Sequence, residues 1–279
     1  MVRCIAYLGP AGTFTEAAAK QHNSKAILQP LASIPGVALA VASKIAEEGV
    51  VPIENSLEGS VTDTLDILIS QAQLFIRREL VLPIDHCLLV MSSTTASDIQ
   101  VIYSHPQALG QCREFLERCF PKAHLVASLS TAAAVGDMKD SKLPAAAIAT
   151  HRAAELNNAD VMAQGIQDNR SNMTRFVVLG NTDQPPTGND KTSLCFSFAE
   201  DKPALLYSVL GEFAQRNINL AKVESRPTKQ SLGEYIFLID IHGHRENTPV
   251  KEAIDALKQQ SSMLRIFGSY PRWDQGEPH

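Results

Sequence analysis

A segment in the second half of the chain, Asn181–Asp190, has no hydrophobic period and consists of Pro, Gly and small polar residues. This composition is typical of a linker between folded units. Before it, short apolar runs alternate with helical patterns, which indicates an α/β domain. After it, the pattern reads strand, helix, strand, strand, helix, strand, which is the ferredoxin-like βαββαβ order. The linker therefore separates two domains of different architecture.

We predict that the first domain spans residues 1–180, the linker 181–191 and the second domain 192–279. Within the first domain, residues 1–80 together with a return strand at 174–180 form one α/β lobe. Residues 81–173 form the other lobe. Among the expected elements are a strand over Leu80–Val90 and a helix over Pro106–Cys119, which has Pro at its first turn.

Charge and hydropathy exclude several classes of protein. The net charge is −5 and no basic run occurs, so nothing in the sequence favours nucleic acid binding. No apolar stretch approaches the roughly 20 residues of a membrane helix, and the first apolar run stops at Gly9-Pro10. We therefore expect a cytoplasmic protein with no membrane partner.

Three polar loops each lie at an expected strand end: residues 9–16, residues 52–60 and the stretch Thr174-Arg175-Phe176. Loops so far apart in sequence can converge only across a cleft. The first loop contains two glycines and leads into a helix, so its free amides and the helix dipole favour an anion. Thr13 and Glu16 fit a capping box, and a plain strand-to-helix turn is the alternative.

The remaining loops offer hydrogen-bond donors to an anion. Asn55 and Ser56 can donate to a carboxylate, or they can serve only as capping groups. Ser130 and Thr131 pose the same choice at a later helix start. His105 is a possible acid or base, although a histidine at a helix start more often satisfies backbone groups.

Thr174 and Arg175 are the strongest chemical candidates, because a reactive hydroxyl stands beside a fixed cation whose planar fork suits carboxylates. The alternative is a surface threonine and a surface ion pair. The sequence contains no Ser-His-Asp order, no metal-binding cluster and no cofactor lysine motif. A reaction here would use positioning, hydrogen bonding and fixed charge, without a metal or cofactor.

Five segments occur in the order and spacing of one enzyme family: GPAGTFTE, VPIENSLEGSVTDTLD, YSHPQALGQC, STAAAV and IQDNRSNMTRFVVLG. The later segment INLAKVESRPTKQSLGEYIFLIDIHGH resembles the C-terminal ACT regulatory module of that family. The chain thus resembles prephenate dehydratase over almost its whole length. The resemblance implies a two-lobed, periplasmic-binding-protein-like catalytic domain with a cleft, followed by an ACT domain. It also implies a monofunctional enzyme without chorismate mutase helices.

The family reaction converts prephenate into phenylpyruvate, water and carbon dioxide in phenylalanine biosynthesis. By resemblance, Thr174 is the essential threonine of the TRF motif, and its hydroxyl would hydrogen-bond the departing oxygen. Arg175 would orient a carboxylate or the loop itself. The expected donors that fix the rest of the substrate are Thr13, Asn55, Ser56, Ser130 and Thr131.

The ACT resemblance implies that L-phenylalanine is an allosteric effector and that paired ACT domains form a homodimer or homotetramer. The effector residues would be Glu224, Ser225, Arg226 and Pro227, together with Ala204 and Leu205 in a loop resembling PGAL. Ala204 stands where the family usually has Gly, and its Cβ could crowd a ligand or forbid a positive φ. A module that only dimerises the chain is the alternative.

Two other functions remain open at this point. Arogenate dehydratase acts on a substrate with an amino group in place of the keto group, and the motifs do not separate the two activities. A non-catalytic sensor of small molecules could also use a two-lobed cleft with an ACT-like module, although the intact TRF stretch argues against it.

Overall fold

A computed structural model of the chain describes residues 3–71, 73–200, 202–228 and 234–273. The helices are α1 (Phe14–His22), α2 (Ile34–Ala42), α3 (Thr62–Ser70), α4 (Pro106–Gln111), α5 (Arg113–Cys119), α6 (Ala133–Lys139), α7 (His151–Asn157), α8 (Leu205–Gln215) and α9 (Thr248–Gln260). Among these described residues, no helix is long and apolar enough to span a membrane. The chain divides into two compact units. The first consists of Met1–Val37, Val50–Val61 and Val81–Phe176, and the second consists of Ala38–Gly49, Thr62–Leu80 and Val177–His279.

One mixed sheet has the order β2-β1-β3-β11-β5, with β4 paired to β3. Its strands are β1 (Cys4–Leu8), β2 (Ile27–Leu31), β3 (Glu48–Asn55), β4 (Gly59–Ser60), β5 (Phe75–Pro83) and β11 (Met173–Gly180). The central residues of β1 (Ile5, Ala6 and Tyr7) and the end of β11 are buried, as expected for central strands. The return strand predicted near residue 174 is therefore confirmed.

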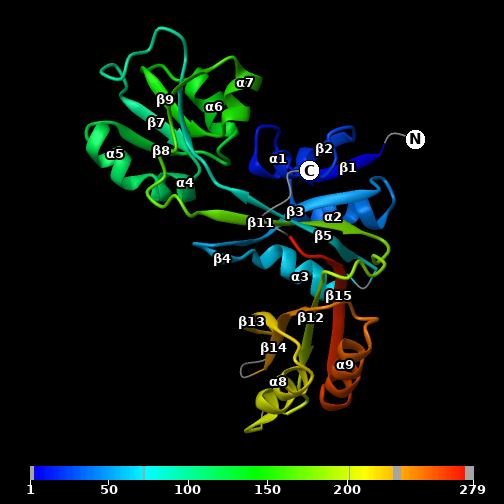
Figure 1. The fold of residues 1–279 in the computed structure, drawn as a ribbon. Coiled ribbons are helices and arrows are strands. Elements are labelled where there is room, and N and C mark those ends of the chain that lie inside the picture. The colour runs from blue at the N-terminus through cyan, green and yellow to red at the C-terminus, as the bar shows by residue number, and fades with distance from the viewer. Residues whose placement is uncertain (1–2, 72, 201, 229–233, 274–279) are drawn as a thin grey trace. The chain divides into compact units, whose positions relative to one another are not determined.

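A second sheet has the order β10-β6-β9-β7-β8 and lies between two layers of helices (Figure 1). Its strands are β6 (Cys87–Val90), β7 (Val101–Ser104), β8 (His124–Ala127), β9 (Ala145–Ala149) and β10 (Asp160–Gln164). Alternate residues of each strand point to opposite faces. Thus Ala147 packs with α6 and α7, whereas Ala146 and Ile148 pack with α4 and α5. Together the two sheets confirm the predicted two-lobed α/β fold.

The chain passes between the two sheets along two adjacent segments, residues 84–86 and 165–172. The predicted strand over Leu80–Val90 is wrong in this respect, because it is divided into β5 and β6. Pro83 cannot donate to a ladder, and the next amide, that of Ile84, donates to Asn172 O at 2.9 Å. His86 N donates to Gln167 Oε1 at 2.9 Å, so the two segments are joined by hydrogen bonds.

The helix predicted over Pro106–Cys119 is also divided, into α4 and α5 at Cys112. Asp168 explains the break. Its backbone N donates to Gln111 O at 2.7 Å, and its carboxylate accepts from Glu114 N at 3.2 Å, as a capping residue does. A residue 57 positions beyond Gln111, and so outside any local pattern, therefore ends one helix and starts the next.

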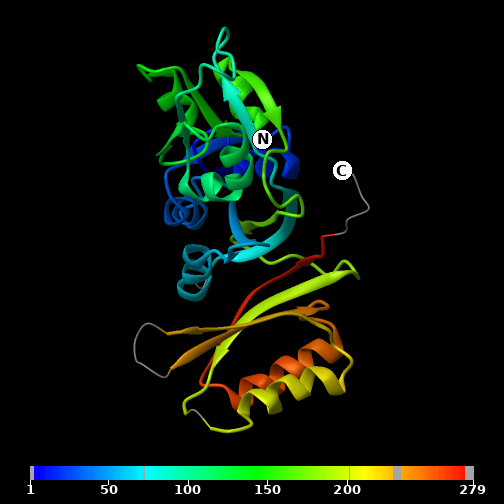
Figure 2. The ribbon, with the colours of Figure 1, turned by 90° about the vertical axis from the view of Figure 1, so that its left-hand side faces the viewer.

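The C-terminal sheet has the order β13-β14-β12-β15, and α8 and α9 lie side by side on one face (Figure 2). Its strands are β12 (Asp190–Ser197), β13 (Leu220–Pro227), β14 (Tyr235–His242) and β15 (Met263–Pro271). Residues such as Phe196, Phe213 and Leu257 fill the core between sheet and helices. The predicted βαββαβ order is confirmed. The domain boundaries stay a prediction, and residues 274–279 of the predicted second domain lie outside the described residues.

Candidate functional site

A cavity of about 460 Å³ lies within the unit that contains the three polar loops. It is lined from both sheets, at the ends of β1, β3 and β7 and at the start of β11, where ligands bind in many open α/β folds. The predicted residues that line the cavity are Thr13, Asn55, Ser130, Thr131 and Thr174. Ser56 and Arg175 are not among its lining residues.

Thr174 and Asn55 form the centre of the arrangement. Both residues are 8% exposed, and Asn55 Nδ2 donates to Thr174 Oγ1 at 2.8 Å. Within the described residues, no protein group accepts the hydroxyl proton of Thr174. A hydroxyl whose oxygen already accepts a hydrogen bond keeps its proton for another acceptor. The Thr174 hydroxyl can therefore donate a hydrogen bond to a molecule bound in the cavity.

Ser56 and Arg175 hold the second loop against β11. Ser56 Oγ accepts from Met173 N at 2.9 Å, and Ser56 N donates to Met173 O at 2.9 Å. Arg175 Nη1 lies 3.4 Å from Glu54 Oε2, with the arginine side chain 13% exposed. These contacts fix the loop that carries Asn55 to β11, and neither residue lines the cavity.

Helix starts face the cavity at three points. Thr13 is the N-cap of α1, accepting from Glu16 N at 3.3 Å, and its hydroxyl donates to Pro10 O at 3.0 Å. Ser130 Oγ accepts from Ala133 N at 3.0 Å at the start of α6. His105 Nδ1 accepts from Gln107 N at 3.3 Å, so His105 caps α4. The positive ends of these helices favour an anion in the cavity.

The predicted capping box is only half formed, because the Glu16 carboxylate accepts from Gly12 N at 2.5 Å instead of from Thr13 N. Burial alone would raise the pKa of Glu16, but Lys20, the Gly12 amide and Arg152 together lower it. Thr150 Oγ1 donates to Gly12 O at 2.6 Å. The glycine loop of one lobe is thereby tied to the start of α7 in the other.

Sequence reasoning missed three residues of the site, Asn172, Gln111 and His86. Gln111 and His86 line the cavity, and Asn172, which is 1% exposed, connects Gln111 to Asn55. Burial lowers the pKa of His86, which favours a neutral imidazole. One signal could have found Gln111: it follows the cavity residue Gln107 by four positions, which places both on one helix face.

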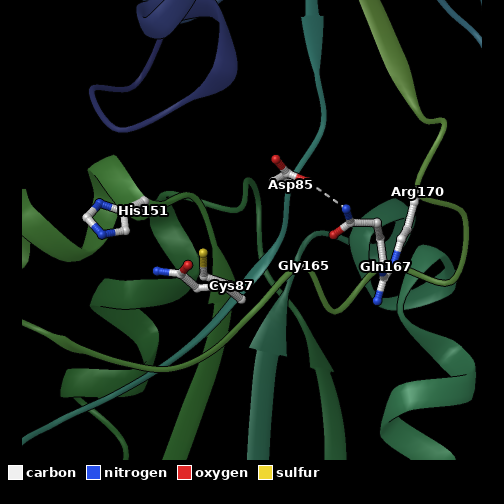
Figure 3. A pocket seen from close by; sticks show the side chains of 7 residues that line it. Asp85, Cys87, His151, Gly165, Gln167 and Arg170 are labelled. Carbon is white, nitrogen blue, oxygen red and sulfur yellow. Dashed lines mark hydrogen bonds between the residues drawn. The ribbon is translucent and has the colours of Figure 1, made fainter.

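A second hollow of about 510 Å³ lies beside the two crossing segments and is lined by Asp85, Cys87, His151, Gln164, Gly165, Gln167 and Arg170 (Figure 3). Gln167 Nε2 donates to Asp85 Oδ1 at 2.7 Å. Burial and the neighbouring Asp85 raise the pKa of the Cys87 thiol, which therefore stays protonated and unreactive. None of the predicted catalytic residues lines this hollow.

The predicted effector residues lie at two places in the C-terminal sheet. Ala204 immediately precedes α8 and has φ 69° and ψ −4°, the left-handed conformation that Gly adopts most easily. Glu224, Ser225, Arg226 and Pro227 end β13, with Ser225 and Pro227 exposed. Arg226 forms an ion pair with Asp66 of α3, the helix that follows the Asn55 loop.

Comparison with known proteins gives consistent findings. Residues 5–184 match the family model described as Prephenate dehydratase, and residues 195–259 match the ACT domain model. A bifunctional chorismate mutase/prephenate dehydratase of Pseudomonas aeruginosa is 40% identical, over 96% of this chain and 73% of its own length. A prephenate dehydratase of Mycolicibacterium gilvum is 37% identical, over 98% of this chain and 92% of its own. The crystal structure of prephenate dehydratase in complex with L-Phe from Arthrobacter aurescens has a TM-score of 0.89 and 37% identity, and the match covers 96% of this chain and 90% of that one.

Proposed function

This chain belongs to the prephenate dehydratase family, and we propose that it converts prephenate to phenylpyruvate, water and carbon dioxide in the cavity beside Thr174. The observation that carries this assignment is the hydrogen bond from Asn55 Nδ2 to Thr174 Oγ1, because it leaves the threonine proton for the substrate. Prephenate carries two carboxylates and a ring hydroxyl, and it becomes aromatic when it loses one carboxylate and that hydroxyl.

The reaction requires that the enzyme orient prephenate and hydrogen-bond its leaving group, because formation of the aromatic ring already drives the bond cleavage. The carbon–carbon bond to the ring carboxylate breaks, its electron pair enters the ring, and the carbon–oxygen bond opposite breaks. Thr174 donates a hydrogen bond to the departing oxygen, which takes up one proton from solvent and leaves as water. An alcohol is a weak acid, so the hydrogen bond and the surrounding dipoles share the stabilisation of the developing charge.

The two substrate carboxylates require donors around the cavity. We assign this role to Asn55, Ser130, Thr131 and the amides at the helix starts, with Thr13 shaping the first of those starts. Gln111 lines the cavity and its Nε2 has no protein partner, so we assign it as a further donor to a carboxylate. Arg175 and Ser56 act indirectly, since they hold the loop that carries Asn55.

Turnover of purified protein tests the activity. With prephenate, we expect release of phenylpyruvate, followed by its ultraviolet absorbance, and a kcat/KM well above that for arogenate. A higher kcat/KM with arogenate, which would release phenylalanine, would assign the chain to arogenate dehydratase. Binding of either substrate without turnover would instead support a sensor.

The ACT module makes L-phenylalanine the expected effector, and we assign its binding to Ala204, Leu205 and residues 224–227. The left-handed backbone of Ala204 supports this, because the loop already has the conformation that the usual glycine would give it. The Arg226–Asp66 ion pair offers a physical route from the effector segment to α3 and the preceding Asn55 loop. No effect of millimolar phenylalanine on activity would contradict the assignment.

Replacing Ala204 by valine is expected to weaken inhibition by L-phenylalanine about tenfold. A β-branched residue is strained at positive φ by roughly 1–2 kcal/mol, and the loop can relieve this only by leaving the left-handed conformation. Titration calorimetry with L-phenylalanine measures the effect. Ala204→Gly is the control and should bind at least as tightly as the wild type. Equal affinity of the valine variant would show that this loop does not contact the effector.

We further propose a homodimer or homotetramer joined through the ACT modules. β13 is an outer strand of its sheet and carries the exposed Val223, so its free edge can pair with a second copy. Light scattering on the purified protein should give a mass of two or four chains. A monomer at micromolar concentration would contradict this proposal.

We also propose that the enzyme acts in the cytoplasm, because its substrate is an intermediate of amino acid biosynthesis. Cell fractionation that follows prephenate-dependent phenylpyruvate release should find the activity in the cytoplasmic fraction. Activity recovered with secreted or membrane fractions would contradict the proposal.

A further inference from the structure

A row of hydrogen-bonded side chains extends from Thr174 along the wall of the cavity, and of its members only Asn172 does not line the cavity. Asn55 Nδ2 donates to Thr174 Oγ1 and to Asn172 Oδ1, each at 2.8 Å. Asn172 Nδ2 donates to Gln111 Oε1 at 3.1 Å, and His86 Nε2 lies 3.0 Å from the same oxygen. This row connects β3 and β11 with α4 and with the two segments that pass between the sheets.

The donor and acceptor of every hydrogen bond in this row of side chains are fixed by the contacts of Asn55 at one end. The backbone amides of Leu57 and Glu58 donate to Asn55 Oδ1 at 2.9 and 3.1 Å, and an amide N–H can only donate. Asn55 must therefore present its NH₂ group to Thr174 and Asn172.

Each carboxamide has an oxygen that accepts and a nitrogen that donates, so the orientation of Asn55 determines the orientation of the next carboxamide. Asn172 accepts through Oδ1 and so donates through Nδ2, which makes Gln111 Oε1 the next acceptor. The partner of that oxygen, His86 Nε2, then carries the proton. Gln111 Nε2 and His86 Nδ1 are left buried without a protein partner.

We propose that Asn172 is a positioning residue of the reaction. It fixes the donor and acceptor ends of its hydrogen-bonded neighbours, so that Thr174 and Gln111 both present donors to the substrate. The inference rests on the function proposed above for the cavity. Asn172 does not line the cavity and acts through its two neighbours. The backbone carbonyl of Asn172 accepts from Ile84 N at 2.9 Å, which anchors this residue where the polypeptide passes between the two sheets.

Asn172→Asp tests the proposal with almost no change of shape. The ionised carboxylate still accepts from Asn55, but it cannot donate to Gln111. The Gln111 amide must then turn over, so that it presents an acceptor where the substrate needs a donor. We expect kcat/KM for prephenate to fall about 10- to 100-fold near neutral pH, the range for a misplaced buried hydrogen bond.

The pH profile separates this effect from a general disturbance. Below its pKa the new carboxyl is protonated and donates as the amide did, so activity relative to the wild type should recover as the pH falls. Burial should raise that pKa above the ordinary value, which brings the recovery into the range between about pH 5 and pH 7. The titratable or charged groups on the segments that contact Asn172 and its partners are Asp85 and His86, Glu54 and Glu58, His105, Asp168, Arg170 and Arg175.

Asn169→Asp is the matched control. It adds the same charge in the same segment, where Asn169 is exposed and its Oδ1 accepts from Ser171 N at 2.8 Å, a role that a carboxylate keeps. This control should retain wild-type kcat/KM at every pH. A folded Asn172→Asp variant with wild-type activity, or with a loss that persists at low pH, would overturn the proposal.

A measurement on the wild-type protein keeps the proposal testable if the variant does not fold. Long-range ¹H–¹⁵N spectra distinguish the two neutral histidine tautomers, and the His86 signal is identified by its absence from His86→Gln. We expect the proton on Nε2. A proton on Nδ1 would show that the row of hydrogen bonds runs in the other direction. Wild-type protein without turnover of prephenate would instead refute the proposed function, so the two failures are distinguishable.

Discussion

Replacing Thr174 by alanine is expected to lower kcat about 10²- to 10⁴-fold, the range for one positioned proton-transfer group. The side chain is almost buried and donates nothing to the described protein, so its hydroxyl proton is free for the substrate. Its removal takes away the group that we assign to the departing oxygen while leaving only a small cavity. Steady-state release of phenylpyruvate measures the change, and an unchanged melting temperature shows that the fold is intact.

Thr174→Ser is the control, because serine keeps the hydroxyl and can still accept from Asn55. We expect it to retain far more activity than the alanine variant. Near-normal turnover by Thr174→Ala would remove this residue from the reaction. The group that assists the departing oxygen would then be another donor of the cavity, and Asn55 and Gln111 would be the first residues to test.

Gly268→Ala is expected to destabilise the protein by about 3 kcal/mol or more, since overpacking against backbone cannot be relieved by a side-chain movement. Gly268 has φ +148° in β15, at the irregular step opposite Ser193 and Leu194. A Cβ there would lie 2.9 Å from the backbone nitrogen of Ile76 and closer still to its carbonyl oxygen. The strand therefore approaches β5 more closely than any residue with a side chain allows.

Thermal unfolding checks this prediction, and a loss of this size should lower the melting temperature by roughly 6–12 °C. Gly211→Ala is the matched control in the same module. Position 211 lies within α8, and a Cβ there would meet nothing within 4 Å. Alanine favours a helix over glycine by about 0.5–1 kcal/mol, so the control should be neutral or more stable. Equal melting temperatures for both variants would contradict the close approach of β15 to β5.

The elements that sequence reasoning missed share a position in the fold. β2 and β5 end one sheet and β8 and β10 end the other, and of these four only β5 overlaps a predicted strand. An edge strand has one neighbour and is partly exposed, so it needs no apolar run; β8 is exposed at every residue and β2 contains Pro30. Central strands such as β9 are buried on both faces, so they carry the continuous apolar runs that a sequence shows directly.

The βαββαβ order of the C-terminal domain and the family were determined by the sequence, because local patterns and ordered motifs carry that information, and the same motifs led us to propose Thr174 and Asn55 as site residues. Two properties were decided only by the tertiary structure: which residues stand behind Thr174, and in which direction their hydrogen bonds run. Asn55 and Asn172 are 117 positions apart, and no local pattern relates them. A carboxamide can point either way until its neighbours are fixed, and here the backbone amides after Asn55 make that choice.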